Sequence, residues 1–284
     1  MNKTGVAVDS AFYLLARTRT VLLDALEALV EHRDVVVVVG AQAVYLRTGG
    51  IQVAIAEATK DSDVAIDTRD LGEDPTINAA MEKAAFIRSP SGQPGAWVTS
   101  DGIPVDIMVP DAIAGGKGSR SVHRPPHDSK AMRRTRGLEA AIVDNSEMLI
   151  EPLAEADNRT ITAKVAGPAA LIVAKCHKIF ERVDSPDRLQ DKDAHDIYRI
   201  LTAFEPEELA PTFIRLLAED VSAEVTNEAV DILQRLFAVG HDAIGSIMAG
   251  RTEEGVGDPE QVSHSIQFLA EDLLNAIQDI AQTG

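Results

Sequence analysis

Several features that would place the chain in common protein classes are missing or scarce. Cys176 is the single cysteine among 284 residues. An internal disulfide is therefore excluded, and a reducing cytoplasm is the expected setting. Aromatic residues make up only 4% of the chain, so aliphatic side chains and alanine must fill the core. No apolar run approaches the roughly 20 residues that span a bilayer, and no signal-peptide core follows the N-terminus, so no membrane partner is expected.

Positive charge is scarce in the last part of the sequence. The formal net charge is −18, and from Glu205 to the end there are 16 acidic residues against 3 Lys and Arg. Residues 1–204 carry 29 acidic residues against 24 Lys and Arg. The acidity thus belongs mainly to the tail and says little about a site in the first two-thirds of the chain.

The first part of the chain predicts a buried strand that is followed directly by a helix. Residues 10–32 have apolar side chains at helical spacing, and five consecutive valines at 35–39 predict a strand buried on both faces. Gly40 comes next, and residues 41–47 look like a helix that begins directly after it. Such a junction directs backbone N–H groups and the positive end of the helix dipole into one crevice. It favours either a phosphate site or a simple turn.

Two aspartates stand at the start of the next strand, Asp61–Asp67. Successive side chains of a strand point to opposite faces, so Asp61 and Asp63 share a face. Two carboxylates about 7 Å apart at their Cα atoms can converge on one divalent cation. The alternative is a solvated strand end.

A third aspartate lies within a predicted hairpin that turns at Asp101-Gly102. Asp106 and Met108 share one face of its second strand, 103–110. An acid inside an apolar strand costs free energy unless it is paired or metal-bound. Otherwise this is an edge strand with Asp106 in water.

A basic, Gly- and Pro-rich stretch follows. Between Gly115 and Gly137 there are seven Lys and Arg and one acid, Asp128. We expect a loop that either clamps a triphosphate or RNA backbone or is merely solvated. Further predicted elements are a helix at 76–88, strands at 138–150 and 161–165, and an inter-helix linker at 250–257.

Two charged helices are predicted before residue 205. Pro168 opens the first, which carries Lys175, Lys178 and Arg182 as one cationic stripe. The second, 191–201, begins at Asp191, a plausible N-cap, and bears Asp193 and Asp196 on one face. They form either part of a site or a salt-bridge network. Beyond residue 205 the pattern is helical throughout.

These motifs together resemble the nucleotidyltransferase (polymerase-beta-like) core, over about residues 35–203. The resemblance rests on Val39-Gly40-Ala41, on Asp61-Ser62-Asp63 and on Val105-Asp106-Ile107. The later lysines, with Lys192-Asp193-Ala194-His195-Asp196, resemble AbiE-type abortive-infection toxins and the related MenT-type nucleotidyltransferase toxins. In that family Gly-Ser or Gly-Gly usually stands where this chain has Gly40-Ala41.

The resemblance implies an α/β (α+β) fold: a nucleotidyltransferase-like mixed sheet with flanking helices in residues 1–165, then an all-helical region, 166–284. It implies a cytoplasmic, metal-dependent nucleotidyltransferase that uses an NTP. Asp61, Asp63 and Asp106 would bind Mg²⁺ or Mn²⁺, and two metals would activate the acceptor hydroxyl and neutralise pyrophosphate. Lys175 and Asp193 would complete the catalytic set, with Lys178 and Asp196 as the alternatives to each. Gly40, Ala41, Lys178 and Arg182 would bind the nucleotide.

The acceptor would be a tRNA 3′ end or a protein hydroxyl, and the setting a toxin with its cognate antitoxin. Two other functions stay open. One is a catalytically inactive relative that binds a nucleotide or a partner, suggested by Ala41 and the acidic tail. The other is a toxin-neutralising protein whose acidic tail mimics RNA.

Overall fold

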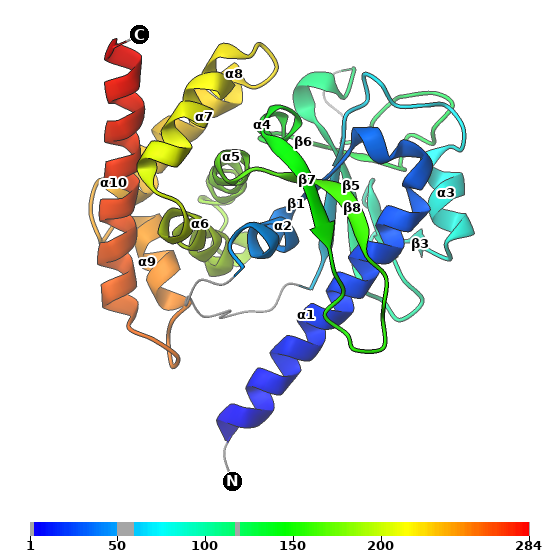
Figure 1. Cartoon of the computed structure of the whole chain (residues 1–284), viewed down its shortest axis with the longest axis horizontal. Coiled ribbons are helices and arrows are strands. Elements are labelled where there is room, and N and C mark those ends of the chain that lie inside the picture. The colour runs from blue at the N-terminus through cyan, green and yellow to red at the C-terminus, as the bar shows by residue number, and fades with distance from the viewer. Residues whose placement is uncertain (1–2, 50–59, 117–119, 284) are drawn as a thin grey trace. The chain divides into compact units, whose positions relative to one another are not determined.

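The computed structural model describes residues 3–49, 60–116 and 120–283 (Figure 1). Contacts along the chain divide it into two compact units. The sheet unit comprises Met1–Ala43, Ala58–Thr135 and Asn145–Ala166, and the helical unit comprises Val44–Glu57, Arg136–Asp144 and Gly167–Gly284. None of the described helices is both long and apolar enough to cross a membrane.

One mixed sheet holds all eight strands of the sheet unit that the structure describes. Its order is β3-β4-β5-β2-β1-β8-β7, and β6 also pairs with β5. The strands are β1 (Val36–Val39), β2 (Ser62–Ile66), β3 (Ile87–Arg88), β4 (Ala96–Val98), β5 (Pro104–Pro110), β6 (Arg133–Thr135), β7 (Asn145–Ile150) and β8 (Ile161–Ala166).

The centre of the sheet is apolar because its strands are covered on both faces. All four valines of β1 are buried, as a continuous β-branched run predicts. β1 pairs antiparallel with β2 and parallel with β8, and β2 pairs parallel with β5. Helix α1 (Lys3–Ala28) packs on β2, β5 and β8 and contacts α3 (Ile77–Lys83) (Figure 1). β2 and β5 are therefore interior strands.

The predicted hairpin is confirmed, but the edge-strand interpretation of Asp106 is wrong. β4 and β5 are antiparallel, with Trp97 opposite Val105. On its other side β5 pairs with β2, so Asp106 stands between two neighbouring strands. The sequence pattern missed this because β2 lies some forty residues earlier in the chain.

Three other local predictions are corrected. The end of the predicted basic loop is a strand, β6, which pairs parallel with the last part of β5. The start of the predicted 138–150 strand is a helix, α4 (Glu139–Val143). Gly137 makes the turn before this helix with φ +89, and its backbone N–H donates to the Glu139 carboxylate at 2.7 Å. The helix predicted to reach residue 88 ends at Lys83, and β3 follows.

The helical unit is built from amphipathic helices that bury their apolar stripes against one another. Pro168 is at the start of α5, as predicted. Gln190, not Asp191, precedes the first turn of α6, and the Asp191 carboxylate instead pairs with Arg251. The helices wholly within this unit are α4, α5 (Pro168–Phe180), α6 (Asp191–Ala203), α7 (Pro206–Ala218), α8 (Ala223–Leu233), α9 (Ile244–Arg251) and α10 (Pro259–Thr283).

The predicted fold class is confirmed: a mixed α/β sheet with helices, followed by a helical C-terminal region. Cys176 is buried in α5, as its apolar surroundings predict, and burial raises the pKa of its thiol well above the ordinary value. The predicted boundary near residue 166 stays a prediction.

Candidate active site

Asp63 and Asp106 are direct neighbours across two parallel strands. The register of β2 and β5 sets Asp63 beside Asp106, with Val64 beside Ile107. Neighbouring residues in such a pair point to the same face of the sheet, and their strands are about 4.8 Å apart. Both residues are partly exposed, while the flanking residues of β2 and β5 are buried. The fold thus brings two of the predicted carboxylates together on one face.

Asp63 also lies directly over the glycine that starts helix α2 (Gly40–Arg47). Gly40 has φ +69, and a Cβ built on it would fall 2.9 Å from both Cβ and Cγ of Asp63. β1 pairs with β2 so that Val39 is opposite Asp63, which carries the carboxylate to the first turn of the helix. A carboxylate there is favoured by the helix dipole. Ala41, the predicted nucleotide-binding neighbour, is buried.

Asp61 directly precedes β2 and is partly exposed. Within residues 3–49, 60–116 and 120–283, no three His, Cys, Asp or Glu side chains lie close enough to hold a metal ion together. The structure therefore does not assemble the predicted site from all three aspartates. Mg²⁺ is commonly held by only one or two protein carboxylates, with waters and substrate phosphates as its other ligands. Asp63 and Asp106 fit that donor set in chemistry and register.

Asp106 has a partner that the sequence did not indicate. An Nη2 atom of Arg133, on β6, donates to Asp106 Oδ2 at 2.7 Å and also contacts Met108 Sδ at 3.3 Å. Both charged side chains are about one-fifth exposed, at 21% and 22%. The acid inside the apolar strand is therefore paired, which is one of the two solutions that its burial requires.

The basic stretch is largely tied to the protein. Arg134 Nη1 donates to Asp111 at 2.8 Å within the sheet unit, and Arg136 pairs with Glu224 and Glu228 at 2.7 Å within the helical unit. Lys117 lies outside the described residues. At least three of the seven cations thus have carboxylate partners, so the loop's positive charge is less available than its composition suggests.

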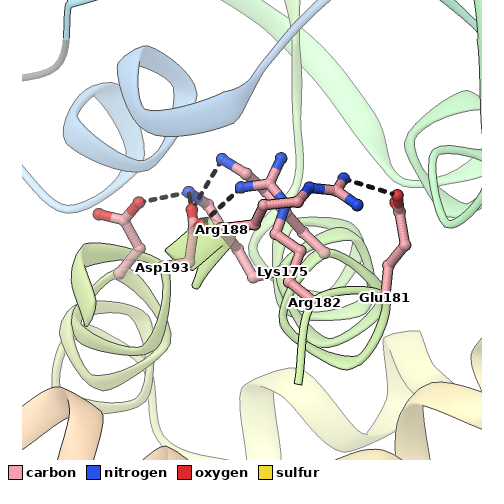
Figure 2. Close-up of polar contacts among 7 residues, drawn as sticks. Lys175, Glu181, Arg182, Arg188 and Asp193 are labelled. Atoms are coloured by element: carbon pink, nitrogen blue, oxygen red, sulfur yellow. Dashed lines mark hydrogen bonds and ion pairs between the residues drawn. The ribbon is translucent and has the colours of Figure 1, made fainter. Parts of the chain in front are cut away.

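In the helical unit the predicted lysines and aspartates do meet (Figure 2). Lys175 Nζ lies 2.7 Å from Asp193 Oδ1 and 2.5 Å from Asp196 Oδ2. Lys178 Nζ lies 2.9 Å from Asp193, and Arg182 Nη1 lies 3.9 Å from it. Lys175 and Lys178 of α5, together with Arg182 in the turn that follows it, therefore converge on one carboxylate of α6.

Burial separates these cations into two kinds. Lys175 is 4% exposed and Asp193 only 1%, whereas the Lys178 and Arg182 side chains are 32% and 23% exposed. Burial alone would lower the pKa of Lys175, but Asp193 and then Asp196 outweigh it and raise that pKa. Burial alone would raise the pKa of Asp193, but Lys175 and Lys178 hold it well below the ordinary value. Lys175 is thus part of the internal support, while Lys178 and Arg182 reach solvent.

Comparison with known proteins adds little. No family model matches the chain, and no curated protein does. One solved structure, "Crystal structure of putative nucleotidyltransferase from H. pylori", covers 93% of this chain and 97% of its own at 10% identity and a TM-score of 0.34. A likeness at that TM-score does not bear on function, so the case for a function rests on the site.

Replacing Gly40 tests how closely Asp63 is held. In Gly40→Ala, backbone strain and collision with Asp63 should together lower the free energy of unfolding by at least about 2 kcal/mol. Gly102→Ala is the control, since Gly102 has φ +84 but nothing within 4 Å of the place that a Cβ would take. It should cost about 1 kcal/mol. Urea unfolding measures both, and equal losses would contradict the close contact.

Removing Lys175 tests the buried cluster. Lys175→Met leaves two buried carboxylates without their main counter-ion, so the free energy of unfolding should fall by about 3–5 kcal/mol. Lys178→Met on the same helix should cost only about 1 kcal/mol, because Lys175 still neutralises Asp193. Similar losses for the two variants in urea unfolding would argue against an internal role for Lys175.

The depressed pKa of Asp193 predicts sensitivity to acid. Its stabilising effect is present above the unfolded-state pKa of about 3.9 and is lost as pH falls below it, because the unfolded chain then binds a proton that the folded chain does not. The free energy of unfolding should therefore fall below about pH 4. Asp193→Asn should flatten that slope, and Asp187→Asn, at an exposed position, should leave it unchanged. Identical slopes in the two variants would contradict this assignment.

Proposed function

We propose that the protein is a metal-dependent nucleotidyltransferase that moves a nucleotide from an NTP to an acceptor hydroxyl. The observation that supports this most strongly is the placement of Asp63. This residue is beside Asp106 in register and directly over Gly40 at the first turn of α2. Two carboxylates and a helix N-terminus thus meet on one face of the sheet, an arrangement suited to a cation-bound phosphate.

Each residue would have a distinct task. Asp63 and Asp106 would hold a divalent cation, and Asp61, which directly precedes β2, would have to move toward them to become a further ligand. Mg²⁺ or Mn²⁺ would supply charge neutralisation on the triphosphate. Gly40 permits the approach of Asp63, since any side chain would occupy the carboxylate's position. By the family resemblance, Lys178 on α5 and Arg182 just after it would bind phosphate oxygens, and both are more exposed than Lys175. Lys175 would keep Asp193 ionised and in place.

The acceptor and setting come from the family resemblance. By analogy with AbiE-type and MenT-type toxins, we propose a tRNA 3′ end or a protein hydroxyl as acceptor, and a toxin paired with an antitoxin. The test is incubation with each labelled NTP, Mg²⁺ and either total tRNA or cell protein, followed by detection of transferred label.

Asp63→Asn should reduce transfer at least about a hundredfold, because a ligand to the cation is worth several kcal/mol in the transition state. Asp67→Asn is the matched control, since Asp67 directly follows the same strand and pairs with Arg69 at 2.6 Å. It should leave transfer unchanged. Transfer that survives in Asp63→Asn would exclude the proposed chemistry.

One observation favours the second candidate, a catalytically inactive relative. Arg133 already neutralises Asp106, as expected where a cation-binding carboxylate has been given a permanent partner. In that case no NTP would support transfer to any acceptor. Nucleotide binding would then also be insensitive to divalent cations.

A further inference from the structure

The ion pair of Arg133 and Asp106 lies on the same face as the proposed cation site. The guanidinium contacts the Asp106 carboxylate at 2.7 Å and the Met108 sulfur at 3.3 Å. Asp106 and Met108 are two residues apart on β5 and so share one face, which by register also carries Asp63, and the guanidinium lies along that face. This carboxylate therefore already contacts a cation that the chain itself supplies.

The position of Arg133 is fixed by its backbone. β6 pairs with β5 so that Arg133 is beside Met108. Gly95, at φ +73, approaches so closely that a Cβ there would lie 2.6 Å from the Arg133 backbone nitrogen and 2.7 Å from its Cβ. The Gly95 N–H donates to Lys130 at 2.9 Å, and its carbonyl accepts from Ile107 at 2.8 Å. The pairing of β6 with β5 and the close approach of Gly95 thus place the Arg133 side chain beside Asp106.

A guanidinium and a divalent cation compete for the same carboxylate. The carboxylate oxygen that accepts from Arg133 is less available to Mg²⁺, and a second cation beside this carboxylate would be repelled by the first. The pair is only about one-fifth exposed, so water screens this repulsion incompletely. Metal binding at Asp106 is therefore weakened for as long as the guanidinium stays beside it.

We propose that Arg133 is a resident counter-ion that closes the metal site until a metal-bound triphosphate displaces it. This inference rests on the proposed function. In the closed form Arg133 neutralises Asp106. With a metal-bound triphosphate present, Asp106 would serve as a cation ligand, and the Arg133 guanidinium would turn from Asp106 to the phosphate oxygens as its anionic partner. A bare metal ion offers no such partner, so it binds weakly.

The test is direct titration of the whole protein with Mn²⁺ alone, in which free Mn²⁺ is followed by electron paramagnetic resonance. Arg133→Gln should bind Mn²⁺ about tenfold more tightly than wild type, since the competing charge is gone. Arg133→Met fills the space beside Met108 without a charge and should show the same gain. Arg124→Gln is the control, because it removes one positive charge from an exposed position of the same stretch. Its affinity for Mn²⁺ should match wild type.

The two proposals fail differently. If wild type and both Arg133 variants share one affinity for Mn²⁺ that Asp63→Asn abolishes, the metal site stands and the counter-ion role is overturned. If Arg124→Gln gains as much as Arg133→Gln, a general charge effect replaces the specific one, and the inference also fails. If no variant shows Mn²⁺ binding that depends on Asp63, the proposed function is overturned together with the inference.

Discussion

The sheet unit depends on how it accommodates two like charges side by side. Asp63 and Asp106 are neighbours on interior strands, where their mutual repulsion would be costly without compensation. The structure compensates each carboxylate separately. Asp63 lies against the first turn of α2, and Asp106 is paired with Arg133. The glycine at position 40, the register of β2 and β5, and the short strand β6 all serve this arrangement.

The helical unit also holds two carboxylates close together, but it buries them with their counter-ion. Its carboxylates at Asp193 and Asp196 are nearly inaccessible, and a buried lysine lies between them. Such a cluster is costly to assemble, because both signs of charge lose their hydration. Once formed, it fixes α5 against α6 and orients the more exposed Lys178 and Arg182. The accessible cations Lys178 and Arg182 are thus held by the buried carboxylate of Asp193.

The sequence predicted those parts of the fold that local patterns determine. The valine run of β1 and the Asp101-Gly102 hairpin have strong short-range signals, the single glycine at position 40 a weaker one, and the structure confirms all three elements. The sequence pattern did not predict the role of Arg133. The three-residue strand β6 is rich in arginine and has no apolar alternation, so only its pairing with β5 makes it recognisable as a strand. The helix α4 was missed for a similar reason, since its start depends on the turn at Gly137. The positions of β6 and α4 therefore depend on strand pairing and turn geometry that the local sequence pattern does not indicate.

Strand β5 has two different partners along one edge. β4 pairs with its first half in the antiparallel direction, and β6 pairs with its last residues in the parallel direction. β6 follows β5 along the chain and returns to the same strand, with which it forms three residue pairs. The backbone of β6 is well anchored, because Met132 just before it is fully buried and the Trp97 indole N–H donates to the Ala131 carbonyl at 3.0 Å. Release of Asp106 would therefore be a movement of the Arg133 side chain alone, while the backbone of β6 and both aspartates stay in the sheet.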